Sequence, residues 1–98
     1  KIQIGNFVLD TESYTLHSKD VCIDFPKKEF DILFKLLSYP DRIFSKEELH
    51  DSIWGVNSES KEETVKTHIN RIRNKLSNIS EISIINIKGL GYKAEIQE

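Results

Sequence analysis

The chain lacks several features that mark specialised classes of protein. It has one cysteine, no methionine, and no apolar run near the ~18 residues of a transmembrane helix. Cys22 alone cannot form an internal disulfide, which suits a reducing compartment such as the cytoplasm. Nothing in its first residues resembles a signal peptide. We therefore expect neither a disulfide-stabilised secreted scaffold nor a membrane partner.

Motifs for catalysis and metal binding are missing as well. The three histidines and the cysteine do not have metal-ligand spacing, so we expect no metal site and no cofactor. There is no glycine-rich phosphate loop and no G-x-S-x-G nucleophile motif. These absences argue against an enzyme.

The length fits one domain with a single modest core. The 98 residues are too few for two such cores. The chain has no initiator methionine and starts within a strand-like pattern, KIQIGNF. We expect residues 1–98 to be one domain, cut from a longer protein.

The charge is distributed unevenly along the chain. The net charge is −2, but residues 1–63 hold 8 basic and 13 acidic residues, a net of −5. Residues 64–93 hold 6 basic residues and 1 acid, a net of +5, and the last five residues add −2. A basic segment on an acidic body is expected where one face meets a polyanion. A solvated helix face would give the same count, so charge alone leaves both interpretations open.

The basic segment contains an amphipathic helix, predicted over about 60–77. Four apolar residues recur at steps of four, three and four and share one stripe: Val65, Ile69, Ile72 and Leu76. The opposite face carries polar and basic side chains: Lys66, Thr67, Asn70, Arg71 and Asn74, with Arg73 and Lys75 on the flanks. No acid lies between Thr64 and Lys75. Ser60 and Glu63 have the spacing of a capping box, which predicts that the helix begins there.

The remaining segments predict a sheet, two more helices and a hairpin. Residues 1–25 alternate with period two and predict a small antiparallel sheet of three or four strands. A largely apolar helix opens at Pro26 and stops at Pro40, and a second begins at Ser45, which has capping-box spacing to Glu48. After the basic helix, residues 82–96 alternate around a Gly-Leu-Gly turn and predict a hairpin.

This order of elements predicts an α+β fold of the winged helix-turn-helix type. It has an N-terminal antiparallel sheet, three helices and a C-terminal hairpin as the wing. The basic third helix follows a short loop and fits the major groove of B-DNA, where arginine pairs with guanine and asparagine with adenine. The wing, residues 88–92 with Lys88 at the tip, could enter an adjacent minor groove.

Three motifs in this order resemble one family. The segment FPKKEFDILFKLLSYPDRIFSKEELHDSIWG looks like the first two helices of the OmpR/PhoB-type response-regulator output domain. The stretch TVKTHINRIRNKL is similar to its recognition-helix signature, TVDVHIxRLRxKL, and IKGLGYKAE is similar to its wing, RGxGYxx. The resemblance covers essentially the whole chain.

The resemblance implies sequence-specific binding of double-stranded promoter DNA and regulation of transcription in a two-component system. In that family a receiver domain lies N-terminal and is phosphorylated by a sensor histidine kinase. The output domains then bind direct repeats as a homodimer. The loop at residues 56–59 stands where the family can touch RNA polymerase.

The resemblance also carries functional positions onto this chain. Arg71 and Arg73 match positions that contact bases and backbone, and Arg71 lies nearer the exposed face. Base contacts are expected from Arg71, Arg73, Asn70 and Thr67. Phosphate contacts are expected from Trp54, Thr64, Lys66, His68 and Tyr92. Lys88 stands where the family's wing arginine enters the minor groove.

Three positions depart from the family pattern. Glu63 replaces an arginine that holds phosphate, so one backbone contact is missing. Lys66 replaces an aspartate and removes a negative charge, and Asn70 lies where members vary, so it can tune specificity. Trp54 and His68 could equally be packed against the core.

Two other functions remain open from the sequence. The domain could belong to a one-component regulator that is not phosphorylated, which the residues preceding Lys1 would decide. It could also be a winged-helix module that binds proteins and has lost DNA binding. The acidic body and Glu63 favour that module, whereas Arg71, Arg73 and Lys88 favour DNA.

Overall fold

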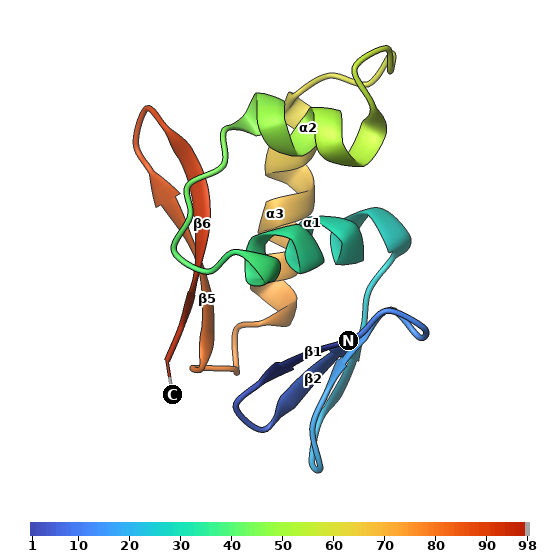
Figure 1. Ribbon diagram of the computed structural model, residues 1–98, viewed down its shortest axis with the longest axis vertical. Coiled ribbons are helices and arrows are strands. Elements are labelled where there is room, and N and C mark those ends of the chain that lie inside the picture. Colours follow the sequence, from blue (N-terminus) through green and yellow to red (C-terminus); the bar gives the residue numbers. More distant parts are fainter. Residues whose placement is uncertain (98) are drawn as a thin grey trace.

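The computed structural model describes residues 1–97, and its elements follow the predicted order of sheet, helices and hairpin. Figure 1 shows the three helices between the hairpin on one side and the N-terminal sheet on the other. The strands and helices are β1 (Ile2–Ile4), β2 (Phe7–Asp10), β3 (Thr15–His17), β4 (Cys22–Asp24), α1 (Lys27–Ser38), α2 (Lys46–Trp54), α3 (Glu63–Lys75), β5 (Ile82–Ile87) and β6 (Gly91–Ile96).

The N-terminal sheet is an antiparallel meander in the order β1-β2-β3-β4. Leu9 and Leu16 are opposite each other in the register of β2 and β3, and both are fully buried. The sheet is joined to α1 by an edge-to-face contact between the rings of Tyr14 and Phe30, with centroids 5.3 Å apart. The period-two alternation thus gives the sheet a dry face that covers the helices.

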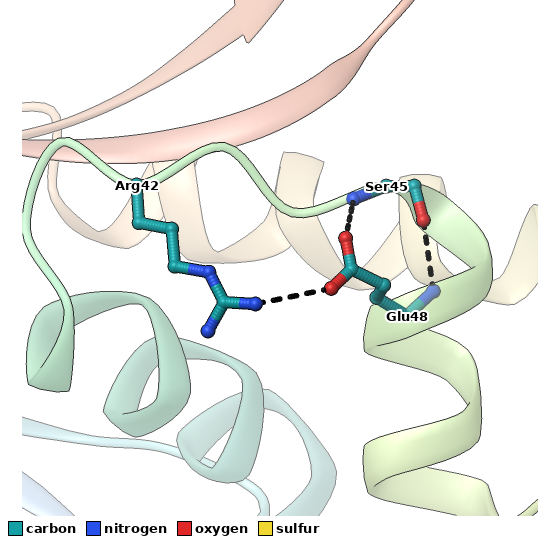
Figure 2. A network of polar contacts seen from close by, with 3 residues as sticks. All are labelled: Arg42, Ser45 and Glu48. Atoms are coloured by element: carbon teal, nitrogen blue, oxygen red, sulfur yellow. Dashed lines mark hydrogen bonds and ion pairs between the residues drawn. The ribbon is translucent and has the colours of Figure 1, made fainter.

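Helix α2 begins as its sequence predicts. Ser45 Oγ accepts a hydrogen bond from the Glu48 backbone N–H at 3.0 Å, and the Glu48 carboxylate accepts from the Ser45 N–H at 3.1 Å. Figure 2 shows these two bonds and a third, in which Arg42 donates to the other Glu48 oxygen at 3.3 Å. The capping box therefore satisfies two backbone donors at the helix start and also ties in the preceding loop.

The predicted start of α3 is wrong by three residues. The helix begins at Glu63 and ends at Lys75, and no side chain caps its first turn. Both parts of the expected box are engaged elsewhere. The Ser60 N–H donates to Ser58 Oγ at 3.1 Å, and the Glu63 carboxylate accepts from Lys46 at 3.4 Å. Spacing alone could not show that these competing partners lie within reach.

The hairpin is joined to the linker between α1 and α2. Phe44 and Tyr92 exchange two backbone hydrogen bonds of 2.8 and 2.9 Å, so the linker extends the β5–β6 sheet by one antiparallel bridge. The approach is close at Gly91, where a Cβ would lie 2.0 Å from the Phe44 carbonyl oxygen. Only glycine fits there, and the wing is thereby held beside the start of α2.

Candidate nucleic-acid interface

Helix α3 has one buried face and one exposed face, as predicted. Four apolar side chains lie in the core at 5% exposure or less: Val65, Ile69, Ile72 and Leu76. Five polar or basic side chains on the other face are exposed: Lys66, Thr67, Asn70, Arg71 and Asn74. Because the first-turn Glu63 is the helix's one acid, the exposed face beyond it is a surface of hydrogen-bond donors and positive charge.

Arg71 is an unpaired cation on this face, as is Lys66. Its side chain is exposed and makes neither a hydrogen bond nor an ion pair with any other residue in the range 1–97. All five guanidinium N–H donors are therefore available to a ligand. The predicted base contact of Arg71 stays a prediction.

Arg73 lies in a different environment, although it is only two residues away. Its Nε donates to the Ile84 carbonyl at 3.0 Å and its Nη2 to Asn86 Oδ1 at 2.5 Å, both on β5. A longer bond of 3.4 Å runs from Nη1 to Asn70 Oδ1 on α3 itself. The guanidinium also lies 5.8 Å from the centre of the Tyr92 ring. Arg73 thus ties the helix to the hairpin, and its predicted base contact stays a prediction.

Lys75 anchors the other end of the helix to the scaffold. Its ammonium lies 3.2 Å from the carboxylate of Glu29, a residue on α1 that is only 3% exposed. It also donates to the Asp24 carbonyl at 3.3 Å and lies 5.1 Å from the Phe25 ring centre. The buried Glu29 was not foreseen, because its partner lies 46 residues further along the chain.

The wing tip, α2 and α3 surround a groove whose wall holds three lysines and two acids, Glu47 and Glu62. Lys46 comes from the start of α2, Lys66 from α3 and Lys88 from the hairpin turn. Lys66 and Lys88 are exposed, and Lys88 makes no side-chain hydrogen bond or ion pair within the described chain. The structure therefore brings two of the predicted residues, Lys66 on the helix and Lys88 on the wing, to one groove. A role for Lys46 at this surface was not predicted, although its position in the first turn of α2 could have indicated one.

Glu63 contacts this groove through Lys46. Its carboxylate pairs with the Lys46 ammonium at 3.4 Å, and both side chains are well exposed. An exposed pair of this kind adds little to stability. Its effect is local: Lys46 offsets a negative charge that would otherwise face the same surface as Lys66.

Trp54 packs against two histidines and a lysine. The ring of His50 stacks on it at 5.5 Å, and the ring of His68 meets it edge-on at 5.1 Å. The Lys28 ammonium lies 5.7 Å from its centre and donates to the Ile53 carbonyl at 3.0 Å. Trp54 is half-buried and therefore has the packing role that its sequence position allowed. A phosphate contact from its indole N–H stays a prediction.

The remaining predicted phosphate contacts differ in availability. His68 Nδ1 lies 2.8 Å from the Thr64 carbonyl, which can only accept, so Nδ1 carries a proton. In the neutral ring Nε2 is then an acceptor, and a phosphate contact from it needs a second proton. Thr64 is half-buried at the helix start, whereas Tyr92 is 5% exposed and belongs to the core. The Tyr92 ring is therefore buried, and its predicted phosphate contact stays a prediction.

No described helix in residues 1–97 is long and apolar enough to cross a bilayer. No group of three or more metal-binding side chains occurs in the same part of the chain.

An N-terminal sheet, three helices with a donor-rich third helix, and a hairpin beside it together define a winged helix-turn-helix domain. The chain belongs to the family described as "Transcriptional regulatory protein, C terminal", whose model matches residues 19–94. This match and the similar proteins below confirm the OmpR/PhoB-type resemblance and the predicted fold. The fold and family are those of transcription regulator domains.

Among curated proteins, the chain is similar to the heme response regulator HssR of Staphylococcus saprophyticus. The two are 36% identical over 96 residues, which cover 97% of this chain and 43% of HssR. The chain therefore spans less than half the length of that relative.

Two solved structures have the same fold. The C-terminal domain of the nisin resistance regulator NsrR, a lantibiotic response regulator, is 30% identical with a TM-score of 0.79, over 95% of this chain and 94% of that one. The DNA-binding domain of the response regulator AdeR, in complex with an intercistronic region, is 25% identical with a TM-score of 0.79. That match covers 99% of this chain and 100% of the AdeR domain.

Proposed function

We propose that the chain is the DNA-binding output domain of a two-component response regulator and binds specific sites in double-stranded promoter DNA. Helix α3 enters the major groove, and the turn between β5 and β6 enters the adjacent minor groove. The single observation that carries this is the exposed face of α3. Beyond the first turn it has no acid, and its donors lie opposite a fully buried stripe.

The residues in the middle of that face contact the bases. Arg71 has all its donors free, and a guanidinium can pair with guanine O6 and N7 through two of them. Asn70 and Thr67 are exposed on the same face. Their shorter side chains reach only base edges that lie directly beneath the helix.

The groove between α2, α3 and the wing binds the sugar-phosphate backbone of the DNA. Lys66 and Lys88 supply its unpaired positive charge toward the phosphates, with Lys88 at the minor groove, whereas Lys46 is paired with Glu63. Further phosphate contacts come from Trp54 at the end of α2 and from Thr64 and His68 in the first turns of α3. These contacts position the domain without reading sequence.

The full-length protein is part of the same proposal. We infer a receiver domain N-terminal to Lys1, phosphorylated by a sensor histidine kinase, because the chain matches only 43% of the length of HssR. On DNA the domains bind direct repeats as a homodimer. The loop at 56–59 contacts RNA polymerase, which fits a Val56 side chain that is 80% exposed. The reducing setting that Cys22 suggests agrees with action in the cytoplasm.

Selection of bound sequences from random duplexes, followed by a salt titration on the selected site, tests this function. We expect a defined sequence and an affinity that falls steeply with salt, by a slope of about 0.9 for each phosphate contacted. Lys66→Gln should lower that slope by about 0.9. The matched control is Lys19→Gln, in the exposed turn before β4, which should leave the slope unchanged. No selected sequence, or an affinity independent of salt, would contradict DNA binding and favour a protein-interaction module.

A further inference from the structure

The hydrogen bonds of Arg73 link two surfaces that both face the proposed DNA site. Its partners on β5 are the Ile84 carbonyl at 3.0 Å and Asn86 Oδ1 at 2.5 Å, and its partner on α3 is Asn70 Oδ1 at 3.4 Å. Three of the five guanidinium donors are thereby used within the protein. An arginine held in this way has fewer donors for DNA than Arg71, but it can fix the geometry of its neighbours.

The neighbours that it fixes are two exposed asparagine amides. An amide has its oxygen and its nitrogen on opposite sides of Cγ, so an Oδ1 turned toward Arg73 turns Nδ2 away from it. Neither Asn70 Nδ2 nor Asn86 Nδ2 makes a hydrogen bond within residues 1–97. Each of these asparagines therefore presents an unpaired NH₂ group on the exposed surface.

We propose that Arg73 is a positioning residue. It holds the wing against the recognition helix and turns the amide of Asn70 so that its NH₂ group faces the DNA. This inference rests on the proposed function, because it assigns the orientation of a residue within that binding site. Asn86 on β5 is the hairpin residue through which Arg73 acts.

The orientation has a consequence for which base Asn70 reads. Adenine is recognised by asparagine through two bonds, one from the amide NH₂ to N7 and one from N6 to Oδ1. The Oδ1 of Asn70 is turned to Arg73, so only the amide NH₂ group of Asn70 is available to a base in the major groove of the DNA. Guanine, whose O6 and N7 are both acceptors, offers such a donor two positions, whereas adenine (N7) and thymine (O4) offer one each.

Sequence selection with single variants tests this arrangement. Wild type should prefer guanine at one base position, and Asn70→Ala should identify that position by losing the preference. Arg73→Gln and Asn86→Ala should each weaken the preference at the same position, by about tenfold for a single base pair. The double variant Asn70→Ala/Arg73→Gln should lose no more than Asn70→Ala, because the two residues act through one contact.

A salt titration distinguishes positioning from a direct phosphate contact. Arg73→Gln should keep the wild-type slope, whereas Lys66→Gln should lower it by about 0.9. A slope lowered by Arg73→Gln, or a changed preference at a different base, would overturn the inference. So would an unchanged preference in Asn86→Ala, which alters only an exposed side chain and is decisive even if Arg73→Gln does not fold. If wild type selects no sequence at all, the proposed function fails as well; if it does, only this inference is at risk.

Discussion

Arg71 and Arg73 show that surroundings decide the role of a residue more than its type does. The two residues are 200° apart around a helix, so one faces outward while the other faces the neighbouring strand. Arg71 is exposed with its donors free, and Arg73 is half-buried with three of them used. The chain thus leaves the side chain of one arginine free, whereas the other arginine joins the helix to the hairpin.

The role of Arg71 can be tested by truncation. Arg71→Ala should weaken binding to the selected site by about 1–3 kcal/mol, because a pair of hydrogen bonds to one base is lost. It should change binding to random duplex much less. Fluorescence anisotropy with both duplexes measures the difference, and Lys19→Ala in the exposed turn before β4 is the control for loss of a charge. An equal loss on both duplexes would mean that Arg71 contacts phosphate and reads no base.

At the residue scale, the sequence predicted which side chains face outward but not what they touch. Periodicity placed Asn70 and Arg71 on the exposed face, because angular position along a helix is a local property. The partners of Arg73 on β5 are 11 and 13 residues away. The path of the intervening chain decides such contacts, and no spacing rule encodes it.

At the scale of elements, two serines illustrate the same limit. Ser45 and Ser60 each stand three residues before a glutamate, and each predicts a capping box. The box forms at Ser45, whereas at Ser60 the backbone N–H is taken by Ser58 and Glu63 by Lys46. The existence of a helix follows from its periodic pattern, but its first residue depends on which local partner is nearest.

These two serines form a matched pair for a stability measurement. Ser45→Ala should lower the free energy of unfolding by about 1 kcal/mol, because an N-cap acceptor is lost. Ser60→Ala should change it by less than about 0.5 kcal/mol, because its hydroxyl caps no helix. Urea denaturation followed by circular dichroism measures both. A comparable loss in the two variants would contradict the assigned start of α3.

At the scale of the whole molecule, the sequence predicted the architecture well. Each element carries its own pattern, and the sheet, helices and hairpin follow in the order of the chain. The attachment of the wing was less predictable. It depends on the bridge between Phe44 and Tyr92 and on the close approach at Gly91, which join segments almost fifty residues apart. The glycine predicted a turn, but its contact with the linker could be seen only in three dimensions.

The dimensions of the molecule lead to a prediction about direct repeats. Its longest extent is 39 Å, and sites one helical turn apart on DNA are about 34–36 Å apart. Two copies bound in the same orientation, with this longest axis along the DNA, would therefore touch, and they would do so through two different surfaces, as a head-to-tail contact requires. We expect two half-sites spaced by one turn to be filled together, at a protein concentration about tenfold lower than a single half-site needs.

Insertion of five base pairs between the half-sites turns the second copy to the opposite face of the duplex. The contact between the copies is then impossible, and each half-site should bind as weakly as it does alone. Electrophoretic mobility shifts on duplexes with one half-site, two in phase and two out of phase measure the effect, and a ten-base-pair insertion controls for distance with phase restored. Equal affinity at every spacing would mean that neighbouring copies make no productive contact. Cooperation in the full-length protein would then have to come from outside this domain.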